Sequence, residues 1–205
     1  RSRIVKQLVS LYLNLKKFST GQGVDLFGVA DISKIKSEFL ISQELLKNFF
    51  AAVSLGVRLS SAVLDEIESA PDRLYFHHYK TLNAFLDQLA FKVSGFIQKK
   101  GFRAIPIAAS QIVDWQLQRA HLSHREIGRL AGLGWLGRNN LLVNQDFGAQ
   151  FRLVTIITDM PLKTGKPLNK DCGECFLCVK ICPSGAIKIN PQDFDYQKCF
   201  DKLKE

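Results

Sequence analysis

The sequence has no hydrophobic run long enough to cross a membrane and no export signal. A membrane-spanning helix needs about 20 predominantly apolar residues, whereas the apolar residues 8–15 are interrupted by Asn14 and followed by Lys16 and Lys17. The same stretch is too early and too polar for a signal peptide with a cleavage site. We therefore expect a cytoplasmic protein with no membrane partner.

Cysteine is scarce, and internal repeats and low-complexity segments are absent. Four of the five cysteines lie between Cys172 and Cys182. They are too clustered for a disulfide framework and suit thiolates that bind metal in a reducing compartment. Hydrophobic residues make up 46% of the 205 residues and charged residues 23%, as in soluble globular proteins. These values predict one main domain with a small appendage.

Acidic residues are outnumbered by basic ones. The chain has 19 Asp and Glu residues against 28 Lys and Arg residues, which gives a formal charge of +9. Such an excess suits a nucleic acid or an acidic redox partner. The basic residues are spread along the chain, however, with only short pairs such as Lys99 and Lys100. Net charge therefore leaves both kinds of partner open.

Most of the chain alternates between helical and strand patterns. Apolar residues after Pro71 recur at helical spacing, which predicts a long helix whose apolar stripe belongs to the core. We expect an α/β (α+β) main domain over residues 1–162 and a cysteine-bearing domain over residues 163–205, whose first residues form a Gly, Pro, Lys and Asn linker. The expected helices are residues 4–18, 71–100 and 124–131, the expected strands are residues 24–30, 49–59 and 103–109, and residues 141–144 and 151–158 are expected to pair as a hairpin.

The spacing Cys172-x2-Cys175-x2-Cys178-x3-Cys182-Pro183 carries the strongest chemical signal. It is the spacing of bacterial ferredoxin-type clusters, in which a short loop turns the thiolates toward one metal centre. Zinc is the alternative, but its ligands commonly come in two pairs separated by a wider gap. We therefore predict that these cysteines bind a [4Fe-4S] cluster.

The fourth cysteine of such a run normally ligates a second cluster. Cys199 is the obvious companion of Cys182 in that second site. Two complete clusters need more thiolates than the chain contains, so we expect the native protein to continue beyond Glu205 with about three further cysteines. The alternative is a single cluster held by the first three cysteines together with either Cys182 or Cys199.

A second motif, Gly132-x-Gly134-x-x-Gly137, follows the expected helix over residues 124–131. Its letters match a dinucleotide-binding pattern, but it follows a helix and opens no new one, so we expect no nicotinamide site. Three glycines can let the backbone approach a bulky ligand. A plain helix-to-strand turn is the alternative. The neighbouring aromatic and polar residues are Trp135, Arg138, Asn139 and Asn140.

Five segments together resemble one known family, in the right order along most of the chain. They are Asp-Leu-Phe-Gly-Val-Ala-Asp at residues 25–31, Ala-Val-Ser-Leu-Gly-Val-Arg-Leu at residues 52–59, Ala-Gly-Leu-Gly-Trp-Leu-Gly-Arg-Asn at residues 131–139, Asn-Leu-Leu-Val at residues 140–143, and the cysteine run with Cys199. In these segments the chain is similar to the epoxyqueuosine reductase family and its shorter relatives.

That resemblance implies a cobalamin-dependent iron–sulfur enzyme, related in architecture to reductive dehalogenases. It implies a nitroreductase-like, corrinoid-binding α/β domain and a small ferredoxin-like domain with two [4Fe-4S] clusters. A reduced donor such as ferredoxin or flavodoxin would feed the clusters, and the reduced cobalamin would act on a small-molecule or tRNA substrate. By the same resemblance, Cys182 and Cys199 would belong to the second cluster. The residues bordering the corrinoid would be Gly132, Gly134, Trp135, Gly137, Arg138 and Asn139.

The chain departs from the family ahead of the glycine motif. Family members that act on tRNA carry an acidic proton donor there, where this chain has Gln118-Arg-Ala-His-Leu-Ser-His124 and Asp114 is displaced by four residues. A His can donate a proton near neutral pH. We therefore take His124, Arg125 and Asp114 as candidate catalytic residues of a reductase whose substrate the sequence does not identify. The alternatives are a non-catalytic electron-transfer protein and an RNA-binding module with a structural cluster.

Overall fold

The computed structural model describes the backbone of residues 2–68 and 70–204, and the side chains from residue 8 onward. The outer limits of the two expected domains, Arg1 and Glu205, lie outside the described residues. No helix within the described part of the chain is long and apolar enough to span a membrane.

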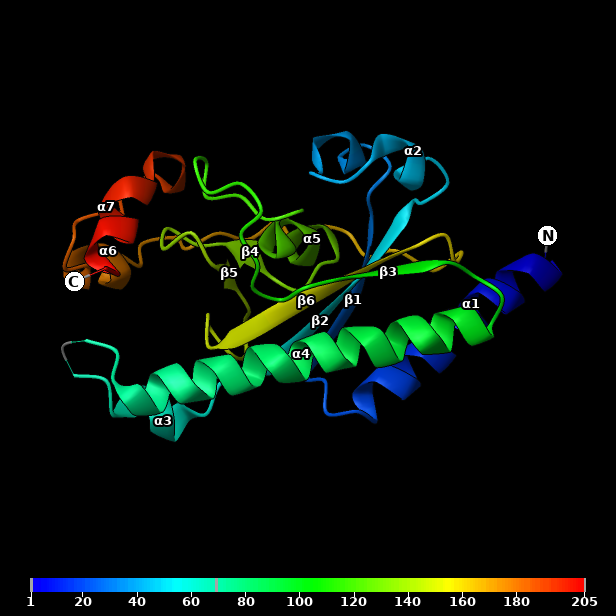
Figure 1. Ribbon diagram of the computed structural model, residues 1–205, viewed down its shortest axis with the longest axis horizontal. Coiled ribbons are helices and arrows are strands. Elements are labelled where there is room, and N and C mark those ends of the chain that lie inside the picture. Colours follow the sequence, from blue (N-terminus) through cyan, green and yellow to red (C-terminus); the bar gives the residue numbers. More distant parts are fainter. Residues whose placement is uncertain (1, 69, 205) are drawn as a thin grey trace.

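A four-stranded antiparallel sheet forms the centre of the molecule (Figure 1). The two middle strands are rich in Val, Ile, Leu and Ala and are buried along almost their whole length, as expected for strands covered on both faces. Pro106 lies in an edge strand, where its missing N–H leaves no gap in the ladder. In spatial order the strands are β1 (Leu26–Asp31), β2 (Ala51–Arg58), β6 (Phe151–Thr158) and β3 (Ala104–Ile107).

Helices cover both faces of this sheet, so the main body has three layers. Side chains alternate along β6: Val154 and Ile156 join one buried cluster, whereas Leu153 and Ile157 join the other. This alternation is the period-two pattern of a strand with two covered faces. The first cluster lies under α1 (Ser2–Thr20) and α4 (Arg73–Lys99), and the second under α2 (Gln43–Leu46) and α5 (His124–Leu130).

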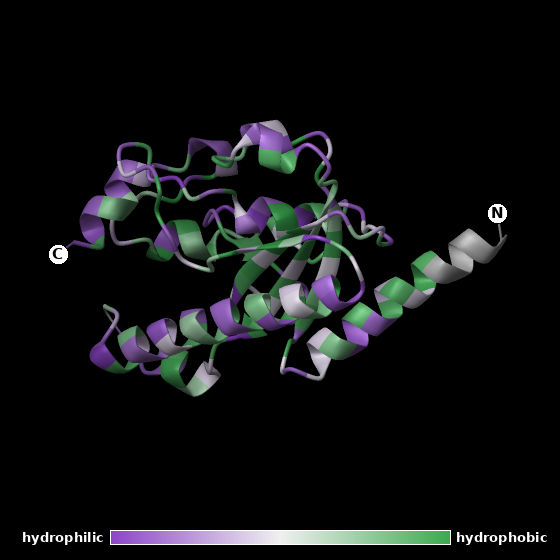
Figure 2. Cartoon of the chain, turned by 45° about the vertical axis from the view of Figure 1, so that its right-hand side comes forward, coloured by the Kyte–Doolittle hydropathy of each residue, from purple (hydrophilic) through white to green (hydrophobic). Residues whose placement is uncertain are grey.

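The cysteine-bearing segment lies at one end of the sheet, beside the short strands β4 (Trp135–Leu136) and β5 (Leu142–Val143). It contains α6 (Leu177–Ile181), a 3-10 turn (Pro191–Asp193) and α7 (Tyr196–Lys202). Figure 2 shows its mixed hydropathy, in contrast to the apolar sheet. Among its described residues 171–204, Ala186 is the only buried hydrophobic side chain. So small a core leaves room for a metal centre to supply folding energy.

The mixed α/β fold and most expected elements are confirmed. The long helix ends at Lys99, and Gly101 shortly after it has a φ of 85°, which suits the left-handed position after a helix C-terminus. The ferredoxin-like character of residues 163–205 stays a prediction.

The expected hairpin between residues 141–144 and 151–158 is wrong. β5 pairs with β4, and β6 pairs with β2 on one edge and β3 on the other. Because both edges of β6 are already occupied, β5 has no ladder to join. A tight turn, in which the backbones of Asn144 and Gly148 bond each other, then redirects the chain into β6. Strand pattern alone does not reveal which edges are free.

Candidate functional site

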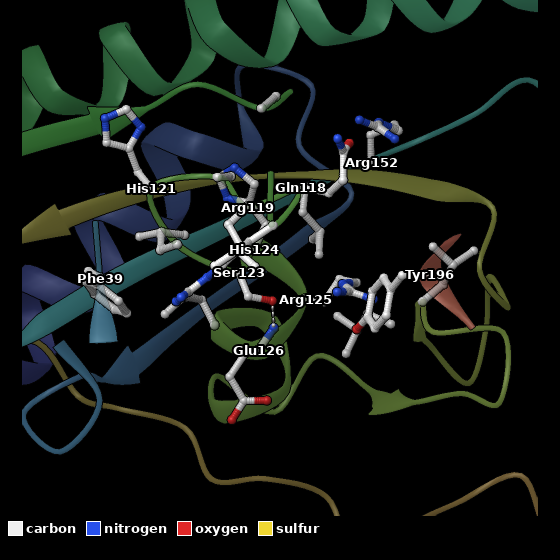
Figure 3. Close-up of a pocket in the computed structure, with 18 of the residues that line it drawn as sticks. Phe39, Gln118, Arg119, His121, Ser123, His124, Arg125, Glu126, Arg152 and Tyr196 are labelled. Atoms are coloured by element: carbon white, nitrogen blue, oxygen red, sulfur yellow. Dashed lines mark hydrogen bonds between the residues drawn. The ribbon is translucent and has the colours of Figure 1, made fainter. Parts of the chain in front are cut away.

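A cavity of about 1100 Å³ opens beside α5 (Figure 3). One wall is the loop and first turn of α5 over residues 116–127, and another is the start of β6. Tyr196, Gln197 and Phe200 of α7 also line it. The cavity therefore lies where the main body meets the cysteine-bearing segment, and its volume is at the upper end of the range for ligand pockets, about 300–1,000 Å³.

Local sequence explains how α5 reaches this place. The Ser123 hydroxyl accepts the N–H of Glu126 at 3.3 Å and caps the helix. Gly128 packs so closely that a Cβ would lie 2.6 Å from a methyl of Leu142. The missing side chain thus lets the helix approach the sheet, with its N-terminal turn facing the cavity.

His124 is a neutral anchor in this wall. Its Nε2 lies 2.9 Å from the carbonyl oxygen of Ala108 and its Nδ1 lies 2.7 Å from the Thr155 hydroxyl. A carbonyl can only accept, so Nε2 carries the proton and Nδ1 accepts from the hydroxyl. Burial lowers the pKa of His124 to about 4. The predicted role as a proton donor near neutral pH is therefore not supported, because both ring nitrogens are engaged and the ring is uncharged.

Three arginines give the cavity positive charge. Arg119 donates to the backbone oxygen of Glu38 and Arg125 to that of Asn140. Arg152 donates to the side-chain oxygen of Asn83 at 3.0 Å and to the hydroxyl of Tyr79 at 3.3 Å. Over the described part of the chain, none of the three has a carboxylate partner within ion-pair distance. Glu38 and Glu126 also line the cavity, and Glu126 is paired with Arg129, so the arginines leave an excess of positive charge that suits an anionic ligand.

Asp114, the third candidate catalytic residue, does not line this cavity. Its Oδ1 accepts the backbone N–H groups of Gln116 and Leu117, each at 3.0 Å. Its backbone pairs with that of Arg119 across the same loop. Asp114 therefore shapes the loop that carries Arg119, and its catalytic role stays a prediction.

The glycine motif packs against the chain itself. A Cβ on Gly132 would lie 2.7 Å from the backbone oxygen of Lys166, and one on Gly134 would overlap the backbone oxygen of Val143. On Gly137 it would lie 2.7 Å from a Val143 methyl. Gly132 and Gly134 are thus required by the turn between α5 and β4, the alternative considered from sequence, and Gly137 by the turn between β4 and β5.

None of the six residues expected at the corrinoid lines the cavity, and their contact with a corrinoid stays a prediction. Asn139 accepts the backbone N–H of Leu141 at 3.2 Å, which stabilises the turn. The indole N–H of Trp135 is buried and has no partner within the described residues. Arg138 reaches away from the glycines into the cysteine-bearing segment.

The five cysteines are free thiols at or near the surface. Hydrogen bonds from the Ser184 hydroxyl and three backbone N–H groups outweigh burial and lower the pKa of Cys182. Burial, together with the charge of nearby Cys182, raises the pKa of Cys199. In residues 2–68 and 70–204, no three Cys, His, Asp or Glu side chains lie close enough together to hold a metal ion.

The donor set nevertheless fits an iron–sulfur cluster in kind and number. Cys172, Cys175, Cys178 and Cys182 are unpaired and lie close together in the sequence, from a turn with a left-handed glycine at position 173 to the C-terminal end of α6. N–H donors directed at a sulfur are also what a cluster thiolate requires. The ligation of a cluster by these cysteines stays a prediction.

Comparison with known proteins gives a consistent result. The chain is 37% identical over 84 residues to the epoxyqueuosine reductase of Escherichia coli (strain K12), covering 41% of this chain and 22% of the relative. It is 29% identical over 146 residues to the epoxyqueuosine reductase of Pseudomonas aeruginosa, covering 67% and 37%. No protein-family model matches the chain.

Solved structures agree in fold. A crystal structure of epoxyqueuosine reductase with an epoxyqueuosine-modified tRNA-Tyr stem loop superimposes with a TM-score of 0.68 at 18% identity, covering 93% of this chain and 56% of that one. A B12-dependent reductive dehalogenase superimposes with a TM-score of 0.72 at 16% identity, covering 86% and 25%. In sequence the chain is similar to epoxyqueuosine reductases, and in fold it is similar to epoxyqueuosine reductase and to a reductive dehalogenase. It spans less than two thirds of the length of each of these relatives.

Sequence reasoning missed several residues that line the cavity in this epoxyqueuosine reductase-like chain. Tyr75 comes from the start of α4, Arg152 from β6, and Tyr196 and Phe200 from α7. Their positions in the sequence span more than 120 residues, and no local spacing links them. The only available signal was Arg152 in an otherwise apolar strand, which marks a charged side chain that needs a partner or a cavity.

Proposed function

We propose that this chain binds a corrinoid in the cavity and a [4Fe-4S] cluster at its cysteines, as part of a reductase. The observation that carries the proposal is the double role of α7. Tyr196 and Phe200 of this helix line the cavity, and Cys199 lies between them in the sequence. The cavity and the cysteine-bearing segment thus share one structural wall, as electron transfer between two bound cofactors requires.

The residues of the chain would form two sites, one for the cluster and one for the corrinoid. Cys172, Cys175 and Cys178 would hold the first cluster, with Cys182 and Cys199 as ligands of that cluster or of a second one. A bound cluster supplies single electrons and a bound corrinoid supplies the metal-centred reduction. The protein positions both groups and limits the access of water.

A tRNA is the substrate that the cavity suits best. The solved relative that superimposes on this chain holds an epoxyqueuosine-modified tRNA stem loop. Here Arg119, Arg125 and Arg152 line the cavity without carboxylate partners in the described residues. Guanidinium groups bind phosphate through paired hydrogen bonds. The net charge of +9 supports the same partner. A reduced ferredoxin or flavodoxin would be the electron donor.

Cobalamin binding to matched variants tests the cavity. Ala120 lines the cavity, whereas Ala84 lies on the exposed side of α4. We expect Ala120→Trp to weaken cobalamin binding at least tenfold, because an indole occupies the ligand's space, and Ala84→Trp to leave it unchanged. Equilibrium dialysis of the anaerobically purified protein, followed by absorption spectroscopy, measures both.

Two outcomes would contradict the proposal. Wild-type protein that retains no cobalamin, although its circular dichroism spectrum shows a folded chain, would exclude the corrinoid role and favour a non-catalytic electron-transfer protein. Equal cobalamin affinity in wild type and Ala120→Trp would place the corrinoid outside this cavity.

A further inference from the structure

Arg138 connects the main body to the cysteine loop through three hydrogen bonds. Its Nε donates to the backbone oxygen of Ile189 at 2.7 Å, its Nη1 to that of Cys175 at 3.1 Å, and its Nη2 to that of Gly173 at 2.9 Å. The guanidinium carbon also lies 4.4 Å from the centre of the Phe176 ring. One side chain thus contacts the start of the cysteine loop, residues 172–182, and also Ile189, which follows the loop in the sequence.

No other residue type could make this set of contacts. The guanidinium is planar and presents fixed, divergent donors, whereas a lysine ammonium is a single compact charge. Each bond from a charged donor to a carbonyl is stronger than a neutral one. Arg138 follows Gly137, which is buried against Val143, so the base of the side chain is held by the turn between β4 and β5. The contacts therefore join a rigid part of the main body to a segment with almost no core of its own.

The positive charge of Arg138 would also act on the electrostatics of the proposed cluster. The guanidinium is bonded to the backbone of Cys175, one of the cysteines proposed as cluster ligands. One-electron reduction makes a cluster more negative, and a nearby fixed cation stabilises that state. The same contacts that orient the loop thus favour the reduced cluster.

We infer that Arg138 is a positioning residue that fixes the cysteine loop on the main body and raises the reduction potential of the cluster bound there. The inference rests on the proposed function in one respect, the binding of a cluster by Cys172, Cys175 and Cys178. It concerns the contacts of Arg138 with the cysteine-bearing segment, and the expected contact with a corrinoid stays a separate prediction.

Two variants and a control separate the two effects. Arg138→Leu removes the hydrogen bonds and the charge, whereas Arg138→Lys keeps the charge and loses most of the bonds. Arg58→Leu is the control, because Arg58 also stacks on an aromatic ring, Phe147 at 4.6 Å, but has no contact with the cysteine loop. Hydrogen exchange by mass spectrometry on the apoprotein measures the loop. A dithionite titration of the reconstituted protein, followed by absorption, measures the potential.

We expect the amide hydrogens of the loop to exchange with solvent at least tenfold faster in Arg138→Leu than in wild type. The N–H of Cys175, which donates to the backbone oxygen of Cys172, is one of them. The cluster of Arg138→Leu should form in lower yield and titrate at a more negative potential. The loop amides of Arg138→Lys should exchange as fast as those of Arg138→Leu, but its cluster should keep a reduction potential closer to that of wild type. Arg58→Leu should match wild type in both measurements.

Unchanged exchange in Arg138→Leu would overturn the positioning role, and an unchanged potential would overturn the electrostatic role. Failure of wild-type protein to take up iron and sulfide would instead contradict the proposed function and, with it, the electrostatic role. The positioning role would then still be decided by exchange in the apoprotein, which needs no cluster.

Discussion

Burial decides the chemistry of individual residues in this protein more than their type does. His124 has the side chain most often used for proton transfer near neutral pH, yet it lies between β3 and β6 with its two ring nitrogens bonded to Ala108 and Thr155. Removing the ring from water disfavours the charged form. The neutral, hydrogen-bonded ring of His124 therefore holds α5 in place. The charged side chains in this wall of the cavity that can act on a ligand are the arginines.

The low pKa of His124 makes the stability of the fold dependent on pH. In the unfolded chain the ring titrates near 6.5, and in the folded chain its pKa is about 4. Below pH 6.5 the unfolded state binds more protons, so the free energy of unfolding decreases as pH falls from 6.5 to 4 and is fully retained above pH 6.5. The loss should be about 3 kcal/mol at most, at 1.36 kcal/mol per pKa unit.

Urea unfolding at pH 7 and pH 5 measures this dependence. His124→Gln keeps polar atoms near both partners but does not titrate, so we expect its stability to change less between the two pH values than that of wild type. An imidazole NMR signal of His124 that titrates near pH 6.5 would contradict the assignment.

Two glycines should respond to alanine in opposite directions. Gly134→Ala should destabilise the fold by about 1–3 kcal/mol, because the new Cβ overlaps the Val143 carbonyl. Gly95 lies in the middle of α4, and an added methyl there would have no neighbouring atom within 4 Å, so Gly95→Ala should stabilise the fold by about 0.5–1 kcal/mol. Thermal unfolding compares the two. Equal effects would show that the turn can relax around residue 134.

At the scale of elements, we expect the segment from α6 to α7 to depend on the proposed metal centre more than the sheet does. The sheet lies between two buried clusters, whereas residues 171–204 contribute Ala186 as their only buried hydrophobic residue among those described. With so little apolar burial, the segment should gain its order from the proposed metal centre and from contacts such as those of Arg138.

Loss of one ligand should therefore affect this segment alone. We expect Cys175→Ser to lower iron and acid-labile sulfide after anaerobic reconstitution and to make residues 171–204 sensitive to protease. The far-ultraviolet circular dichroism of the main body should change little, because the layered core does not involve the loop. Cys182→Ser and Cys199→Ser, measured in the same way, identify the remaining ligands. Zinc without sulfide in the wild-type protein would contradict the iron–sulfur assignment.

At the scale of the whole molecule, the excess positive charge should act through the cavity. The chain carries 28 basic against 19 acidic residues, and the arginines of the cavity have no carboxylate partners among residues 2–68 and 70–204. An RNA backbone bound there would release counterions, so affinity should decrease steeply with salt.

Arg119 tests this whole-molecule expectation because it is exposed and lies on the cavity wall. Arg119→Gln should weaken binding of a tRNA stem loop and reduce the slope of log affinity against log salt by about one. Arg58→Gln, which removes the same charge outside the cavity, should change the slope less. Fluorescence anisotropy over a salt series measures both. Equal slopes for the two variants would indicate binding by net charge alone.

Local patterns were sufficient for the parts of the fold that local physics controls. The apolar stripe after Pro71, the capping Ser123 and the glycine at position 101 led to α4 and α5 with limits within a few residues of the structure. The cysteine spacing identified the proposed ligands without reference to the fold. The hairpin failed because the pairing of β6 depends on strands about 50 and 100 residues away.

The sequence by itself determined the α/β class of fold, through strand and helix periodicities, and led to the prediction of thiol metal ligands, through cysteine spacing, because both depend on neighbours a few residues apart. The tertiary structure alone decided that the glycines serve a turn, that His124 is neutral and that Arg138 contacts the cysteine loop. It also decided that α7 forms a wall of the cavity. Burial and contact arise from segments brought together by folding, and no local spacing encodes them.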